Sequence, residues 1–235
     1  MAIFVTNCAI CGGKVTEDTP CVATSGVAFA PPHPLYKFCD AGLHQRCLVD
    51  WEHRREFSMG YVNGSGTILR REDEWNLICG PLSYGPHGKP GWPYYAEIRL
   101  ADWPLRLYSK FENWGAFVGN KEWKMGFIPE INQAIELLRL EFPQTDAELR
   151  EYLWQPLLET MLNDPEHRSR YVAAVTLNLY DDDKLRAVIA ELRQAKRDQH
   201  GSVRDAAHLI LKRLGETTKA EQGGGGQPAT RPESK

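Results

Sequence analysis

Hydrophobic residues in the second half of the chain recur at intervals of three and four positions, the spacing of one face of an α-helix. Pro143 closes the first stretch of this pattern, because proline cannot continue a helix. Pro156 lies inside the second stretch and is expected to kink or split that helix. The pattern predicts helices at 131–142, 147–162, 166–179, 183–197 and 202–214.

The middle of the chain shows short apolar and aromatic runs separated by turn residues, which is typical of β-strands. We expect strands at 75–79, 94–100 and 105–108, with a loop at 80–93 that is rich in proline and glycine. Five of the seven tryptophans lie in this region. We interpret most of them as core, and we expect Trp92 and Trp103 to carry exposed rings in turns, where a ligand or partner could bind.

Composition narrows the class of protein. The 235 residues carry 28 Lys+Arg against 31 Asp+Glu, and 42% of them are hydrophobic. These values exclude a mostly disordered chain and a coiled-coil rod, and they disfavour a strongly basic nucleic-acid binder. No stretch has the pattern of a secretion signal or a membrane helix, so we expect a cytoplasmic protein. The glycine-rich residues 216–235 are expected to form a disordered tail.

Five of the six cysteines lie in the first 47 residues. Cys8 and Cys11 form a C-x-x-C pair followed by two glycines, which favour a tight turn with both sulfurs directed at one point. His44 and Cys47 are spaced to lie on one face at the start of a helix. These four side chains predict a tetrahedral site for one zinc ion, with Cys39 as the alternative ligand. Cys21 has no assigned role.

This arrangement resembles a treble-clef zinc finger of the LIM and RING-like kind, over about residues 7–57. The gap between the two pairs, 12–43, is longer than is usual in LIM domains, and the eight ligands of a RING are not present. The resemblance implies a structural zinc ion. Four protein ligands also leave no open position for a reacting water, which favours a structural over a catalytic site.

The segments 170–180 and 204–214 match at a spacing of 34 residues, with Arg170 aligned to Arg204 and Leu177 to Leu211. The pattern resembles short HEAT repeats, in which stacked helix pairs bind partners on a concave face. The repeated arginine is expected to pair with acidic turn residues of its own or a neighbouring repeat. The alternative is a plain helical bundle whose periodicity is accidental.

The sequence therefore predicts an α+β protein with a zinc-finger domain at 1–60, an aromatic-rich β-containing region at 61–129 and a HEAT-like helical domain at 130–215. We expect a non-catalytic adaptor or regulatory protein that binds another protein. The alternatives are a nucleic-acid-associated zinc-finger protein and, less favoured, an enzyme using the aromatic middle. The candidate residues for a binding surface are Arg193 and Arg197, in a small basic cluster. The candidates for catalysis are Cys79, His87 and Glu97 in the middle of the chain. We expect Cys79 to be a buried strand residue.

Overall fold

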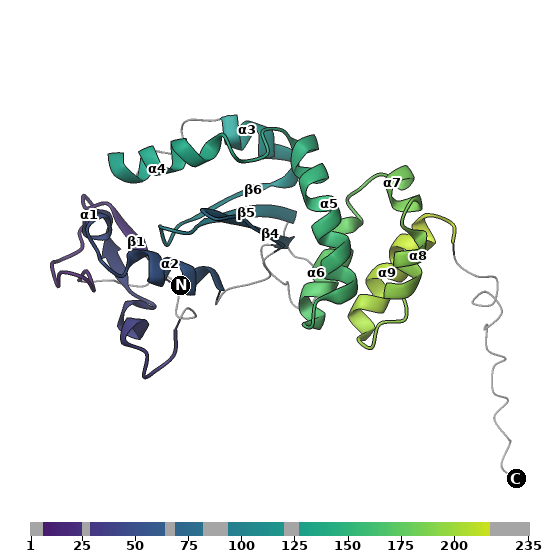
Figure 1. Cartoon of the computed structure of the whole chain (residues 1–235), viewed down its shortest axis with the longest axis horizontal. Coiled ribbons are helices and arrows are strands. Elements are labelled where there is room, and N and C mark those ends of the chain that lie inside the picture. Colours follow the sequence, from purple (N-terminus) through teal and green to yellow (C-terminus); the bar gives the residue numbers. More distant parts are fainter. Residues whose placement is uncertain (1–6, 25–28, 64–68, 82–93, 120–126, 217–235) are drawn as a thin grey trace, which may run out of the picture. The chain divides into compact units, whose positions relative to one another are not determined.

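The computed structural model describes residues 7–24, 29–63, 69–81, 94–119 and 127–216. They belong to two compact units, Met1–Thr160 and Met161–Lys235. The first unit combines a two-stranded sheet, a four-stranded sheet and helices, and the second contains helices (Figure 1). The predicted α+β class is confirmed. The expected tail at 216–235 lies outside the described residues apart from Glu216.

The small sheet near the N-terminus pairs β1 (Cys21–Ala23) with β2 (Gly42–His44) in antiparallel register. The 3-10 helix η1 (Pro34–Phe38) lies between these strands in the sequence. The short helix α1 (Gln45–Val49) begins directly after β2, and α2 (Arg54–Asn63) follows it. The sequence did not predict α2, which carries the fully buried ring of Phe57.

The central sheet is an antiparallel meander in the order β3-β4-β5-β6. The strands are β3 (Arg70–Arg71), β4 (Trp75–Pro81), β5 (Tyr94–Leu100) and β6 (Arg106–Lys110). The three predicted strands are thus confirmed, and β3 is an addition. One face of the sheet is apolar and buried, because alternate residues of each strand point the same way. That face carries Trp75, Leu77, Cys79, Ala96, Ile98, Leu100 and Leu107.

The tryptophans described in this region are core residues. Trp75 packs edge-on against Phe142, and the Nε1 of buried Trp114 donates to the Pro143 carbonyl at 2.7 Å. The expected exposure of Trp103 is wrong, since this ring is only 6% exposed. The guanidinium of Arg54 on α2 lies 4.1 Å over its centroid, so the helix that the sequence did not reveal covers the ring. Trp92 lies outside the described residues.

The opposite face of the sheet holds a buried ionic cluster. Glu97 on β5 is fully buried, and its carboxylate accepts hydrogen bonds from Arg99 and Arg106. Arg99 is 3% exposed and lies directly opposite Arg106 in the β5–β6 register. Two like charges in facing positions would repel, and the shared carboxylate offsets that repulsion.

The remaining helices of the first unit follow the sheet in the sequence. They are η2 (Phe111–Asn113), α3 (Trp114–Gly119), α4 (Pro129–Arg139) and α5 (Asp146–Asn163), whose last residues enter the second unit. The helix α5 continues through Pro156, so the expected split does not occur. Proline removes one backbone hydrogen bond, while Leu153 and Leu157 on either side are fully buried and hold the helix in place.

The second unit contains α6 (His167–Leu177), α7 (Asp182–Arg186), α8 (Ile189–Ala195) and α9 (Gly201–Arg213). The predicted single helix at 183–197 is two helices, because Val188 adopts a non-helical conformation with φ −122° and ψ 29°. The break still leaves Leu185, Val188 and Leu192 buried. None of the helices described has the length and apolar character that crossing a membrane requires.

We predict that Glu97→Gln lowers the free energy of unfolding of the first unit by roughly 3–5 kcal/mol, because it leaves buried Arg99 without this carboxylate. Tryptophan fluorescence during urea unfolding measures this directly, since all seven tryptophans lie before residue 160. The control is Glu112→Gln at an exposed position, which should change stability by less than about 0.5 kcal/mol. Equal unfolding midpoints for the two variants would contradict the prediction.

Candidate functional site

The structure brings Cys8, Cys11, His44 and Cys47 together. Their ligand atoms all lie within 4.8 Å of one another. The Nδ1 of His44 is 3.5 Å from the Cys11 sulfur and 3.8 Å from the Cys47 sulfur. Tetrahedral coordination with metal–sulfur bonds of about 2.3 Å places ligand atoms roughly 3.5–3.8 Å apart. The cluster can therefore hold one metal ion with little rearrangement.

The first two sulfurs are positioned by a tight turn. The Gly12 N–H donates to the Cys8 carbonyl at 2.8 Å, and the Cys8 N–H donates to the Gly13 carbonyl at 2.7 Å. Gly12 has φ +72°, a conformation that residues with a Cβ rarely adopt. The Gly13 N–H also points at the Cys11 sulfur, at 3.3 Å. This explains physically why two glycines follow the C-x-x-C pair.

The second pair is positioned where β2 ends and α1 begins. His44 is extended, with φ −60° and ψ 133°, and its N–H donates to the Cys8 sulfur at 3.3 Å. Its Nε2 lies 3.2 Å from the Lys14 carbonyl, which can only accept a hydrogen bond. The proton must then be on Nε2, which leaves the Nδ1 lone pair directed at the sulfurs.

Without a metal ion, the surrounding protein shifts the pKa values of Cys8 and Cys47 in opposite directions. Burial and the neighbouring Cys11 and Cys8 raise the pKa of Cys47 to about 12. Burial acts in the same direction on Cys8, but backbone N–H groups, that of His44 first, outweigh it and lower the pKa of that thiol. A bound cation favours the thiolate form of each cysteine ligand, so it would oppose the effect of burial and of the neighbouring cysteines on the pKa of Cys47.

Within the described part of the chain, the cluster includes neither Cys39 nor Cys21. Cys39 follows η1, where its N–H donates to the Tyr36 carbonyl at 2.9 Å. Cys21 is exposed on β1, opposite His44 in the register. The two closely spaced pairs in the sequence, Cys8 with Cys11 and His44 with Cys47, were the signal that identified the four ligands.

The residues considered for catalysis in the aromatic middle do not come together. Cys79 faces Ala96 and belongs to the apolar side of the sheet, whereas Glu97 points to the other side. Both are buried, and the Glu97 carboxylate is bound by two arginines. His87 lies outside the described residues.

In the second unit, the 34-residue spacing has a counterpart in hydrogen bonds. The Nη1 of Arg170 donates to the carbonyls of Asp164 and Pro165, and the Nη1 of Arg204 donates to those of Asp198 and Gln199. In both turns the aspartate Oδ1 accepts a backbone N–H two residues later, at 2.8 Å. Two turns that match in sequence are thus built in the same way.

The two turns are also linked to each other. Arg170 forms a two-pronged pair with the Asp198 carboxylate, at 2.7 and 3.0 Å, and both side chains are 12% exposed. The hydrogen bond from Arg170 lowers the pKa of Asp198. The expected pairing of the repeated arginine with an acidic turn residue is therefore present for Arg170.

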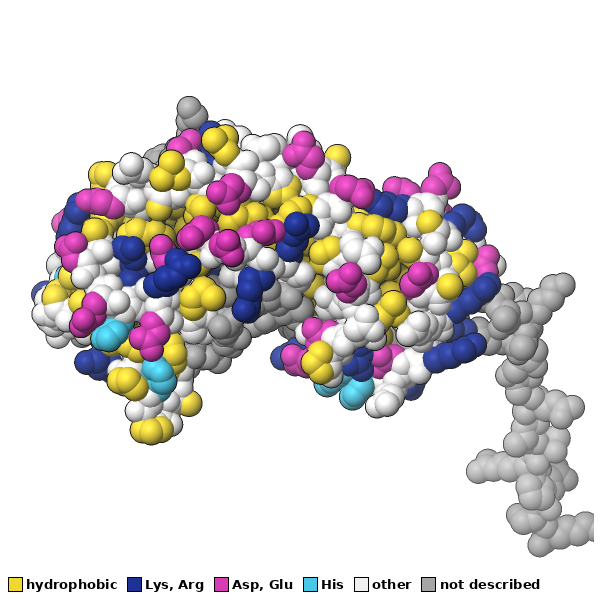
Figure 2. All heavy atoms as spheres, viewed as in Figure 1, with side chains coloured by type: hydrophobic (Ala, Val, Ile, Leu, Met, Phe, Trp, Pro, Cys, Tyr) yellow, Lys and Arg dark blue, Asp and Glu magenta, His cyan; other side chains and the backbone are white. Residues whose placement is uncertain are grey.

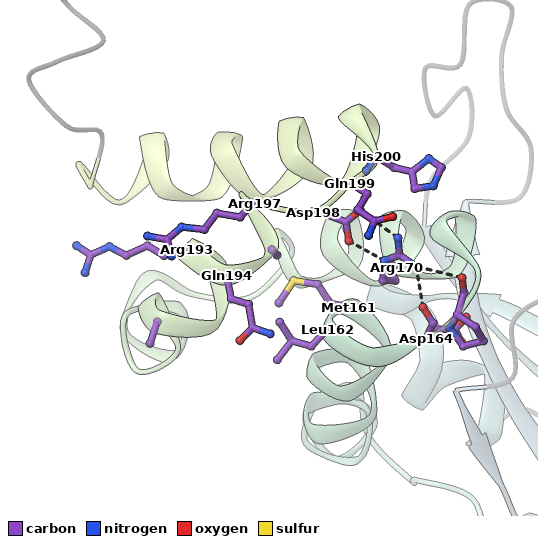
Figure 3. A pocket seen from close by; sticks show the side chains of 13 residues that line it. Met161, Leu162, Asp164, Arg170, Arg193, Gln194, Arg197, Asp198, Gln199 and His200 are labelled. Atoms are coloured by element: carbon purple, nitrogen blue, oxygen red, sulfur yellow. Dashed lines mark hydrogen bonds and ion pairs between the residues drawn. The ribbon is translucent and has the colours of Figure 1, made fainter.

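A groove of about 880 Å³ lies between these turns and α8. Figure 3 shows the Arg170–Asp198 pair and Asp164 on one side, Arg193 and Arg197 on the other, and Gln194 with Met161 and Leu162 between them. Its volume is within the range of ligand pockets in proteins. The structure thus places Arg193 and Arg197, whose sequence pattern fits either a partner surface or cations at a solvated helix end, on a concave site.

A smaller apolar hollow of about 190 Å³ lies in the first unit beside α4. Leu137 and Leu140 of this region are 70% and 78% exposed. Figure 2 shows hydrophobic side chains gathered on this face of the first unit, with charged side chains around them. The hollow is lined by Glu74, Leu100, Asp102, Trp103, Ala134, Leu137 and Leu138.

Comparison of the chain with protein-family models, curated proteins and solved structures finds no match. The geometry and chemistry of the two sites therefore carry the functional argument.

We predict that Gly13→Ala weakens binding of a divalent metal ion by about tenfold. A Cβ at residue 13 would lie 3.2 Å from the Cys11 sulfur, so that ligand would have to shift, and it would also contact the His44 ring at 3.5 Å. Chelator competition measures the affinity. Gly119→Ala is the control, because a Cβ there meets nothing within 4 Å. Equal affinities for the two variants would show that the turn tolerates the added methyl group.

Proposed function

We propose that this protein is a non-catalytic interaction protein, an adaptor or regulator, with one structural zinc ion in its first unit and a partner-binding helical unit at its C-terminal end. The observation that carries the proposal is the groove between α8 and the two equivalent turns of the second unit, because concave surfaces between stacked helical repeats are sites where partner chains bind. The metal cluster supports the structural part of the proposal.

Zinc is the metal that this ligand set suits best. Three thiolates and one imidazole are soft and borderline donors, and the four together favour tetrahedral coordination. With four protein ligands, the ion would have no open position for water or substrate. The site therefore supports a role in folding rather than in catalysis.

The local topology supports the treble-clef interpretation. A turn carrying two cysteines is followed by the β1–β2 pair and then by α1, with His44 and Cys47 at the start of that helix. The site is also connected to the rest of the first unit. The Gln45 side chain accepts the Ile128 N–H at 2.9 Å, and Arg55 pairs with Asp102 at 2.6 Å. An ordered metal site would thus hold α1 and α2 in the positions that make these contacts.

The HEAT-like interpretation of the second unit rests on its repeated turns and its small buried residues. Ala173 on α6 and Ala207 on α9 are both fully buried, 34 positions apart. Their small side chains allow the helices to approach closely, while the buried Leu177 and Leu211 fill the core. Arg170 and Arg204 make equivalent hydrogen bonds to the carbonyls of their own turns, and this equivalence disfavours an accidental periodicity.

We predict close to one zinc ion per chain in freshly purified protein. Cys8→Ser should lower the zinc content strongly, whereas Cys39→Ser should leave it unchanged, because Cys39 lies outside the cluster. Elemental analysis of the three proteins measures this. Chelation should change the tryptophan emission of the first unit and leave the helices of the second unit folded. Absence of zinc, or its loss in Cys39→Ser, would contradict the assigned site.

We predict that Ala190→Trp abolishes partner binding. Ala190 is exposed in the groove, so an indole there fills the space without entering the core. Affinity capture from cells of the source organism compares the wild-type chain with this variant. The matched control is Ala147→Trp, at an exposed position on α5 in the first unit. If the same proteins are captured by the wild type and by Ala190→Trp, the groove is not the binding site.

A further inference from the structure

We infer that the groove of the second unit binds an acidic, extended segment of a partner protein, with a carboxylate of that segment pairing with Arg197. This inference rests on the interaction function proposed above and names the chemistry of its partner. It follows from the uneven distribution of charge in the groove, from the way its arginines already bind carboxylates, and from the composition of its floor.

The charged groups of the groove are not equivalent. On one side Asp198 and Arg170 neutralise each other at 2.7 and 3.0 Å, and both are largely buried. On the other side Arg193 and Arg197 are exposed (Figure 3). The accessible positive charge therefore lies at one end, where an incoming anionic group would meet it first.

The molecule already contains examples of the proposed contact. The Arg170 guanidinium takes the carboxylate of Asp198 in the fork geometry that suits arginine. Arg193 pairs with the carboxylate of Glu216 at 2.6 Å, and Glu216 follows the C-terminal end of α9. Glu216 thus shows that a carboxylate from a non-helical segment of chain can pair with an arginine that lines the groove.

Arg197 is the arginine at this end that remains available. Among the described residues, no ion pair or side-chain hydrogen bond is found for its guanidinium, while its backbone N–H donates to the Gln194 carbonyl. It follows the C-terminal end of α8, and Figure 3 shows its side chain running to the same side as that of Arg193. Two cations at the C-terminal end of α8 could also serve to stabilise the helix dipole. That role does not require Arg193 and Arg197 to line a groove, which they do.

The floor and walls suit a peptide. Half-buried Leu162 supplies apolar surface, and the exposed amide side chains of Gln194 and Gln199 can bond the main chain of an extended segment in both directions. A segment that places an apolar side chain over Leu162 and acidic side chains toward Arg197 would match the groove along its length.

The same distribution disfavours a nucleic-acid strand. The groove is also lined by Asp164, beside the Arg170–Asp198 pair in which the two charges offset each other. A strand carries a phosphate at every nucleotide and would bring negative charge against the Asp164 carboxylate. A peptide can carry its acidic residues at one end only, so it satisfies both sides of the groove.

The test uses the full chain and pools of short fluorescent peptides with a fixed leucine. One pool carries Asp and Glu beside the leucine, a second carries Asn and Gln, and a third carries Lys. Fluorescence anisotropy should show the acidic pool binding at least about tenfold more tightly than its amide counterpart, with weakening at high salt. Arg197→Glu should abolish this preference and shift it toward the Lys pool. Arg186→Glu, at an exposed position on α7, is the control and should bind like the wild type.

The outcomes separate this inference from the proposed function. If Ala190→Trp loses the captured partner but the wild type shows no preference for acidic peptides, the interaction function stands and the assigned chemistry is wrong. If Arg197→Glu binds the acidic pool as the wild type does, the assigned residue is wrong. If a single-stranded oligonucleotide binds more tightly than the acidic pool and this binding is lost in Arg197→Glu, the groove serves nucleic acid and the inference is overturned.

Discussion

The meeting of three sulfurs and one imidazole at a single point is the constraint on which the N-terminal part of the structure depends. The elements around it are too short to be stable alone, since β1 and β2 have three residues each and α1 has five. Their order comes from the contacts that the cluster fixes, including the N–H of His44 on the Cys8 sulfur. Because α2 begins a few residues after α1, the position of the cluster also influences where Arg54 lies. The Arg54 guanidinium in turn covers the ring of Trp103.

Arginine–carboxylate pairs serve different purposes in the two units. In the central sheet, Glu97 is fully buried and bonds both Arg99 and Arg106, so the cluster favours one register of facing strands. In the helical unit, the Arg170–Asp198 pair joins two turns at the wall of a groove. The buried cluster around Glu97 stabilises the strand register inside the first unit, whereas the Arg170–Asp198 pair forms part of a surface groove.

The parts of the fold that the sequence predicted are those set by local pattern. The strand at 94–100 and the ligand pairs around Cys8 and Cys47 follow from residues close together in the chain. The features that it missed depend on distant contacts. Trp103 looked like an exposed turn residue because α2, which covers it, has a weak amphipathic pattern. The break at Val188 was hidden because the residues on both sides keep helical spacing and remain buried.

The groove could be anticipated only in part, for a related reason. The repeat pattern located the helices, and a basic cluster marked Arg193, but the concave surface forms only when the turn at Asp164 meets the turn at Asp198. The core of the second unit lies elsewhere, in alanines and leucines of α6, α8 and α9 that are fully buried. The exposed groove residues Arg193, Arg197 and Gln199 lie outside that core, so they can be exchanged at little cost in stability, unlike the buried Arg170–Asp198 pair. Exposed side chains that do not hold the fold together can be varied for binding specificity, and this is the physical reason for proposing the partner site there rather than at the metal cluster.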